Sequence, residues 1–194
     1  EIPALLGSHL EKVIPENLWN WCLNKKKAGW QAPKIAKTFS LVDHILSLAG
    51  DPKVIIFSTQ VTALDLMADR LVEDYSEKTR FSRLDGSMTS TRRSEALDDF
   101  RNSKDCRILL ASYKVCAESL TITEASFCIL LDFWWNNATR DQAVARLWRL
   151  GQTRKVTVFS IKASGTLDAR IEEVCRMKNI LASEYLKGGS DKKN

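Results

Sequence analysis

Apolar and polar positions follow a changing period along this chain. From Lys34 to Leu48 apolar residues recur at helical spacing, and the pattern stops at Gly50-Asp51-Pro52, where glycine and proline end a helix. The run Lys53–Ser58 follows at once and is rich in β-branched apolar residues, as in a strand buried on both faces of a parallel sheet. Residues 64–75 again place their apolar side chains on one helical face. The pattern therefore predicts a helix, a buried strand and a second helix.

The same alternation continues toward the carboxyl terminus. Further strands are predicted at residues 80–84, 107–112, 127–132 and 155–161, with helices at 90–101 and 141–150 and a long amphipathic helix from Thr166 to about Leu186. Strands separated by helices in this order are typical of βαβ units with right-handed crossovers. The predicted fold class is α/β, with a doubly wound, mostly parallel sheet flanked by helices. Four segments are expected: a linker or insertion (1–33), the α/β lobe (34–165), the long helix (166–187) and a disordered tail (188–194).

Composition narrows the class of protein. A chain of 194 residues with 44% hydrophobic content is long enough for one well-buried core. Its longest apolar runs fall far short of the ~20 residues that cross a bilayer, so no membrane partner is expected. Five cysteines without a CxxC pair, beside only two histidines, predict reduced thiols and no metal site. The net charge of +5 is compatible with a polyanionic partner, although many other proteins share it.

Small polar residues follow the predicted strands, where ligands of open α/β sheets gather. Ser58 ends the first strand, and Asp85-Gly86-Ser87 follows the second. Their hydroxyl and backbone N–H groups suit phosphate oxygens. Asp-Gly is also one of the commonest turn signals, so these residues alone favour a plain turn.

A cationic helix face is the most specific chemical feature of the sequence. Gln142, Arg146 and Arg149 stand at i, i+4 and i+7 within the predicted helix 141–150, so they project from one side. Guanidinium groups on such a face suit the γ-phosphate of a nucleotide held by a facing domain, as an arginine finger does. Spacing alone fits equally well a solvated basic face or arginines paired with local acids.

The surrounding residues resemble a known motif. The pattern Gln142-Ala143-x-x-Arg146-x-x-Arg149-x-Gly151-Gln152, preceded by Trp134-Trp135-Asn136, resembles motif VI of the Swi/Snf-type superfamily 2 ATPases. The resemblance is nearest to the subgroup that contains post-replication-repair translocases. Residues 54–66, 83–101 and 108–123 resemble motif IV, the block after it and motif V, in the family order. Thr166–Asp168 and the helix that follows resemble the brace that closes the family's second lobe.

The resemblance implies a RecA-like second lobe that works with an N-terminal ATPase lobe of the same polypeptide, where most contacts to ATP and Mg²⁺ lie. Arg149 resembles the arginine finger, with Arg146 and Gln142 beside it in the nucleotide cleft and Asp132 in the segment before it. Double-stranded DNA and nucleosomes are the implied partners, and the nucleus is the implied location. Contacts to the DNA backbone are implied for Ser58, Ser87, Arg93, Ser112, Lys114 and Thr121.

Motif V departs from the family pattern. The family reads Ser-x-Lys-Ala-Gly-Gly-x-Gly-Leu-Asn-Leu-Thr, whereas residues 112–123 contain no glycine and place Cys116, Ala117 and Ser119 at the glycine positions. Glu118 adds a negative charge near a surface meant for phosphate. Because glycine permits backbone conformations that these residues resist, we expect unusual coupling between ATP and DNA.

Two other functions are compatible with parts of the pattern. One is a non-catalytic DNA- or protein-binding module of the same fold, in which motif V has decayed. The other is an RNA helicase of the superfamily, which the Trp-Trp-Asn and Arg-x-Gly-Gln signatures disfavour. The sequence contains no GxxxxGK[ST] phosphate loop, so the chain by itself is predicted to hydrolyse no ATP.

Overall fold

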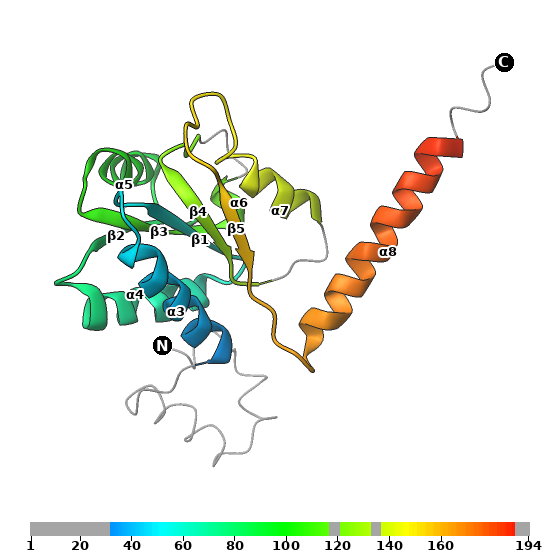
Figure 1. Cartoon of the computed structure of the whole chain (residues 1–194), viewed down its shortest axis with the longest axis horizontal. Helices are drawn as coiled ribbons and strands as arrows, with labels where there is room; N and C mark the ends of the chain where they lie inside the picture. Colours follow the sequence, from blue (N-terminus) through cyan, green and yellow to red (C-terminus); the bar gives the residue numbers. More distant parts are fainter. Residues whose placement is uncertain (1–31, 117–120, 133–136, 189–194) are drawn as a thin grey trace, which may run out of the picture. The chain divides into compact units, whose positions relative to one another are not determined.

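A five-stranded parallel sheet forms the centre of the molecule (Figure 1). The computed structural model describes residues 32–116, 121–132 and 137–188. All strand pairs are parallel, in the order β2-β3-β1-β4-β5, which confirms the predicted fold class. The strands are β1 (Lys53–Ser58), β2 (Arg80–Leu84), β3 (Cys106–Ser112), β4 (Ala125–Leu130) and β5 (Thr157–Ser160).

Helices alternate with these strands along the chain, as expected for βαβ units. The first, third and last of them lie within one or two residues of the predicted ranges. They are α3 (Pro33–Ser47), α4 (Val61–Tyr75), α5 (Ser90–Asn102), α6 (Tyr113–Cys116), α7 (Asn137–Val144) and α8 (Leu167–Gly188).

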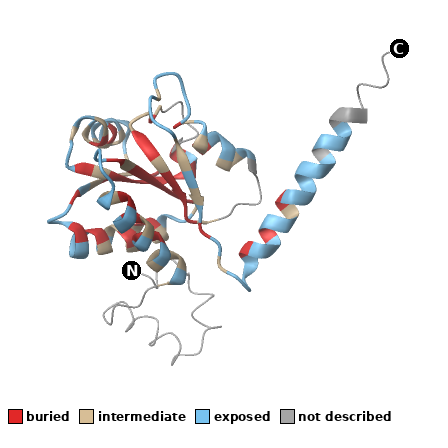
Figure 2. Ribbon diagram, viewed as in Figure 1, coloured by how far each residue is buried: buried red, intermediate tan, exposed pale blue. Residues whose placement is uncertain are grey.

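The sheet is buried on both faces because the middle positions of its central strands are apolar. In β1, Val54 and Ile56 pack toward α3 and α4, while Ile55 and Phe57 pack toward α5, α6 and the end of α7; all four side chains are fully buried. Figure 2 shows buried residues along the strands and on the covered sides of α3 and α4. Each such side chain contributes about 1.5–3 kcal/mol by leaving water. Packing on two faces therefore fixes the position of every strand end.

Strand β4 differs from its predicted range. It begins at Ala125 and ends at Leu130, two residues before the predicted start and end. The small residues Ala125 and Ser126 are buried, and Ala125 pairs with Lys53 of β1. Pairing with β1 therefore extends the start of the strand beyond its apolar run, and Asp132 lies in the loop after the strand instead of at its end.

Helix α8 starts at a polar cap rather than at an apolar contact. The hydroxyl of Thr166 accepts a hydrogen bond from the Asp168 N–H at 3.3 Å, as N-cap side chains do. Asp168 accepts from the Ala163 N–H at 2.9 Å and pairs with Lys34 of α3 at 2.5 Å. These contacts tie the start of α8 to the lobe. The bracing role of α8 stays a prediction, and the predictions for residues 1–31 and 189–194 lie outside the described residues.

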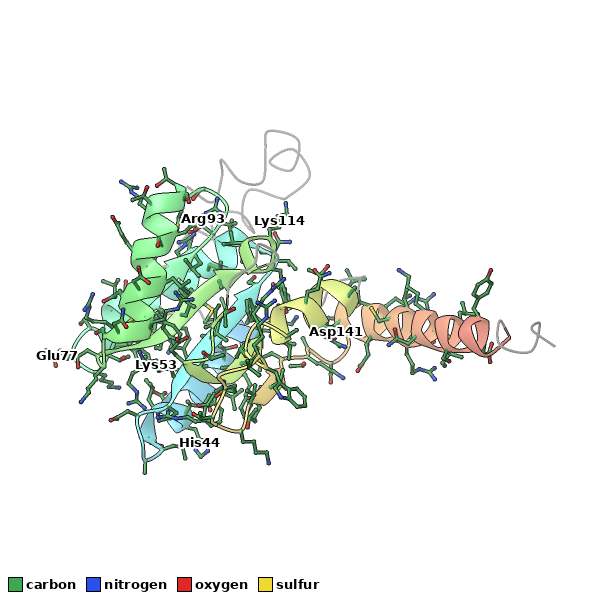
Figure 3. The ribbon with its side chains drawn as sticks, turned by 90° about the horizontal axis from the view of Figure 1, so that it is seen from above. His44, Lys53, Glu77, Arg93, Lys114 and Asp141 are labelled. Atoms are coloured by element: carbon green, nitrogen blue, oxygen red, sulfur yellow. The ribbon has the colours of Figure 1, made fainter. Side chains whose placement is uncertain are left out.

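Parallel strands give the sheet two chemically different edges. We call the ends of the strands with the loops that follow them the carboxyl edge, and the strand starts with the loops that precede them the amino edge. In Figure 3, Arg93 and Lys114 lie at one end of the lobe, and Lys53, His44 and Glu77 lie at the opposite end. These two ends correspond to the carboxyl and amino edges, and the predicted site residues divide between them.

The described residues hold neither a membrane-spanning helix nor a metal-binding cluster. No described helix is both long and apolar enough to cross a membrane. The same residues contain no group of three or more side chains suited to hold a metal ion.

Candidate functional site

Asp132 organises the carboxyl edge beside β1. Its carboxylate accepts a hydrogen bond from the Ser58 hydroxyl at 2.6 Å and from the Thr59 N–H at 2.9 and 3.1 Å. Burial, and then the negative charge of Asp132, raise the pKa of Tyr113, whose hydroxyl lies 3.5 Å from the Asp132 carbonyl. Ser58 is fully buried, and its hydroxyl bond to Asp132 joins the end of β1 to the loop after β4.

A second carboxylate organises the loop after β2. Asp85 is almost fully buried, accepts from the Ser87 N–H at 2.9 Å and from the Ser87 hydroxyl, and pairs with Arg83 at 2.6 Å. Arg83 reaches on to Asp65 of α4, also at 2.6 Å. Burial alone would raise the pKa of Asp85, but the hydrogen bonds from Ser87 and the charge of Arg83 hold it below its ordinary value. The turn that carries Ser87 is therefore fixed by an ionised group.

Cationic and polar side chains of the carboxyl edge lie around these two carboxylates. Lys114 in α6 is exposed. Arg93, in the first turn of α5, is half-buried and donates from its Nε to the Met88 carbonyl at 3.1 Å. Ser112 is buried, and its hydroxyl has no hydrogen-bond partner among the described residues. The carboxyl edge thus combines an exposed positive charge with hydroxyl and backbone N–H groups that Asp132 and Asp85 hold in place.

Helix α7 is shorter than the sequence predicts, which corrects the predicted arrangement of its cationic face. The prediction was one helix over residues 141–150, but α7 spans Asn137–Val144 and turns follow it. The Arg146 N–H reaches back only three residues, to the Ala143 carbonyl at 3.1 Å. Gln142 therefore lies in the helix, while Arg146 and Arg149 lie in the turns after it, and the three do not share one helical face.

These turns place Arg149 at the amino edge beside Thr121. The exposed guanidinium of Arg149 donates from Nη1 to the Thr121 hydroxyl at 3.1 Å. The backbone carbonyl of Arg146 accepts from the Ile122 N–H at 3.0 Å. The segment before β4 and the turns after α7 are thus joined by one backbone and one side-chain hydrogen bond.

Gln152 and Gly151 hold these turns in place, although neither was among the predicted site residues. The Gln152 amide donates to the Ala125 carbonyl at 3.0 Å and to the Leu147 carbonyl at 3.3 Å, and its oxygen accepts from the Arg154 N–H at 2.9 Å. Gly151 has a φ of 104°, which side chains with a Cβ rarely adopt. The Arg-x-Gly-Gln signature was the available signal, because it contains both residues.

The structure therefore sorts the predicted site residues into two groups. Ser58, Ser87, Arg93, Ser112 and Lys114 lie at the carboxyl edge, and Asp132 lies there too, bonded to Ser58. Arg146 and Arg149 lie at the amino edge with Thr121. The prediction had grouped Asp132 with the arginines and Thr121 with the DNA contacts. The Trp134–Asn136 turn and residues 117–120 of motif V lie outside the described residues.

Sequence comparison relates this chain to helicases. Residues 37–151 match the model of the helicase conserved C-terminal domain family. The chain is 37% identical over 155 residues to the DNA repair protein rad8 of Schizosaccharomyces pombe, a match covering 78% of the chain and 13% of that protein. It is 42% identical over 125 residues to the helicase-like transcription factor CHR28 of Arabidopsis thaliana, covering 64% and 12%. The chain thus spans less than a quarter of the length of these relatives.

Solved structures give the same relationship. The C-terminal part of the Fun30 ATPase domain aligns with a TM-score of 0.69 at 28% identity, over 75% of this chain and 46% of that one. The Sulfolobus solfataricus SWI2/SNF2 ATPase core, solved in complex with double-stranded DNA, aligns with a TM-score of 0.64 at 25% identity, over 77% and 30%. This chain therefore belongs to the helicase conserved C-terminal domain family and is the RecA-like C-terminal lobe of a Swi2/Snf2-type ATPase.

Proposed function

We propose that this lobe forms half of an ATP-driven translocase on double-stranded DNA. In this proposal the amino-edge arginines face a nucleotide held by an N-terminal ATPase lobe, and the carboxyl edge holds the DNA backbone. The observation that supports it most directly is the exposed guanidinium of Arg149, hydrogen-bonded to Thr121 at the edge opposite Lys114 and Arg93. Two separate cationic surfaces suit two separate polyanions.

The chemistry of the amino edge fits a phosphate group. A guanidinium offers five N–H donors in a fixed plane, and the Thr121 contact engages one nitrogen of Arg149. The remaining donors suit the oxygens of a γ-phosphate, where positive charge stabilises the charge that develops during transfer. The described residues contain no group of three or more side chains suited to hold a metal ion. Mg²⁺ is usually bound through the phosphates and one or two carboxylates, which in this proposal belong to the N-terminal lobe, while this lobe supplies positive charge.

The carboxyl edge fits a DNA backbone. Lys114 is exposed, Arg93 is half-buried, and Ser87 is exposed on a turn fixed by Asp85. Such groups contact phosphates without reading bases, so binding would be insensitive to sequence and weakened by salt. Ser58 is buried against Asp132, and we assign it the role of fixing the Thr59 loop rather than of touching DNA. In this proposal the partners are duplex DNA and nucleosomal DNA, and the protein acts in the nucleus.

The arginine finger is tested by Arg149→Ala in the full-length protein that contains this lobe. We expect DNA-stimulated ATP hydrolysis to fall by about 10³-fold or more, the usual effect of removing such a residue. Arg154→Ala is the matched control, because Arg154 is an exposed arginine on the loop that follows these turns. It should leave hydrolysis within about two-fold of the parent protein.

Two results would contradict the proposal. Unchanged hydrolysis by Arg149→Ala would remove the catalytic role and favour a DNA- or protein-binding module. ATP turnover by the purified 194-residue chain, abolished by the same substitution, would show that no second lobe is needed.

A further inference from the structure

Arg101 connects helix α5 to the segment that contacts Arg149. It lies one residue before the end of α5, and its Nη2 donates to the Thr121 carbonyl at 2.6 Å. Its guanidinium also lies 3.8 Å from the Glu124 carboxylate and 3.6 Å from that of Asp98. One side chain therefore contacts both ends of the short segment Thr121–Glu124 that leads into β4.

Contacts with Lys53 of β1 fix the backbone around Arg101. Lys53, the first residue of β1, donates from Nζ to the carbonyls of Arg101 at 3.2 Å and Ser103 at 2.8 Å, and also to that of Phe100. A cation at a helix carboxyl terminus satisfies carbonyls that have no partner within the helix. Phe100 is fully buried under the sheet. The end of α5 is therefore a firm support from which Arg101 reaches Thr121.

Thr121 joins this support to the exposed arginine. Its backbone carbonyl accepts from Arg101, and its hydroxyl accepts from Arg149 at 3.1 Å. An exposed arginine side chain can adopt many rotamers, so a fixed acceptor restricts the conformations that it samples. Both bonds come from a charged guanidinium, and the bond from Arg101 is the shorter at 2.6 Å, which makes it the stronger of the two.

We propose that Arg101 is a positioning residue for Arg149, acting through Thr121. It does not touch the nucleotide; it holds the Thr121–Glu124 segment so that the Thr121 hydroxyl meets Arg149 in one place. Arg93 and Arg101 also lie on the same 13-residue helix, about 20 Å long, so α5 reaches from the carboxyl edge to the amino edge. This inference rests on the proposed role of Arg149.

The test compares single and double substitutions in the full-length protein. Arg101→Ala should lower kcat for DNA-stimulated ATP hydrolysis by about 10-fold with a smaller change in KM. A misplaced catalytic group stabilises the transition state less well, and this loss appears mainly in kcat. Arg101→Lys, which keeps a cationic donor, should recover part of that loss. In an Arg149→Ala background, Arg101→Ala should have no further effect, since there is no guanidinium left to position.

Arg80→Ala is the matched control for α5. Arg80 forms an exposed ion pair with Asp99 of the same helix at 3.0 Å and makes no contact with Thr121. It should leave kcat unchanged. A second pair of variants avoids any change in charge: Thr121→Val removes the hydroxyl and should lower kcat, whereas Thr121→Ser keeps the hydroxyl and should not.

The outcomes separate this inference from the proposed function. If Arg149→Ala leaves hydrolysis unchanged, both proposals fail. If Arg149→Ala abolishes hydrolysis but Arg101→Ala and Thr121→Val behave like the parent protein, only the positioning role fails. An additive loss in the Arg101→Ala, Arg149→Ala double variant would also overturn it, because it would show that Arg101 acts by a separate route.

Discussion

The two edges of the sheet satisfy their polar groups in different ways. At the carboxyl edge, Asp132 and Asp85 each accept several hydrogen bonds from neighbouring backbone and hydroxyl groups. At the amino edge, the exposed guanidinium of Arg149 makes one hydrogen bond, to Thr121, among the described residues. The two carboxylates are thus internally bonded supports, whereas Arg149 is an exposed charged group held by one hydrogen bond.

This difference separates residues that stabilise the lobe from residues that act on a partner. A carboxylate that accepts several hydrogen bonds is costly to remove, because its donors then lose their acceptor. An exposed arginine with one neutral acceptor adds little to folding. We therefore expect substitution of Asp132 or Asp85 to lower the free energy of unfolding, and substitution of Arg149 to leave it almost unchanged.

The largest loss of stability is expected for Asp132→Ala. It removes the charged acceptor of the Thr59 N–H and of the Ser58 hydroxyl, which keeps the Gln60 carbonyl at 3.1 Å, and each bond to a charged group contributes about 1.5–3 kcal/mol. Urea unfolding of this chain should show a loss of about 3 kcal/mol. Asp141→Ala, which removes an exposed ion pair with Arg140, is the control and should cost less than about 0.5 kcal/mol. Similar losses of unfolding free energy for both variants would contradict the view that Asp132 supports the fold and that Asp141 is a solvated charge.

A smaller, pH-dependent loss is expected for Asp85→Asn. The folded-state pKa of Asp85 is lowered, so its ionised form stabilises the fold at every pH above the unfolded-state pKa of about 4. This stabilisation is lost as the pH falls from that value through the lower folded-state pKa. At pH 7 the substitution should cost about 1–2 kcal/mol. The difference from the parent chain should narrow in urea titrations below pH ~4. Asp51→Asn, at a highly exposed carboxylate, should show neither effect.

Gly151→Ala tests the turn that carries the amino edge. A φ of 104° strains any residue with a Cβ, so we expect a loss of about 1–2 kcal/mol even though the space around Gly151 is open. Gly86→Ala is the control, because Gly86 also has open space but no positive φ. Equal thermal unfolding midpoints for the two variants would contradict the role assigned to backbone conformation.

The smallest effect on stability is expected for Arg149→Ala. Only the bond to the Thr121 hydroxyl is lost, so the free energy of unfolding should change by less than about 0.5 kcal/mol. Urea unfolding beside Asp132→Ala gives the direct comparison. A loss above about 2 kcal/mol would show that the arginine is part of the scaffold.

Sequence predicted the sheet well because its strands are specified locally. The run Lys53–Ser58 is apolar and β-branched, and its observed bounds equal the predicted ones. Strand β4 was misplaced by two residues because Ala125 and Ser126 are not strongly apolar, and only pairing with β1 includes them. Local pattern thus located each strand, while tertiary pairing set the ends of β4.

The candidate site was less predictable because it depends on where helices stop. Period alone continued α7 to Leu150, yet the helix ends at Val144, where Arg146 and Leu147 bond back only three residues. The bonds from Gln152 to Ala125 and Leu147 that hold this turn join residues up to 27 positions apart. The Asp132–Ser58 bond spans 74 positions. Contacts between residues so far apart leave no repeating pattern in the sequence. The sequence therefore indicated which residues belong to the site but not how they are grouped.

The most direct test of the two-edge account measures ATP hydrolysis by the full-length protein as the concentration of duplex DNA is varied. We expect Arg149→Ala to lower the maximal rate and to leave the DNA concentration for half-maximal stimulation unchanged. Lys114→Ala should instead raise that concentration and change the maximal rate little. The reverse pattern, or equal effects of both substitutions on both quantities, would contradict the assignment of the amino edge to the nucleotide and the carboxyl edge to DNA.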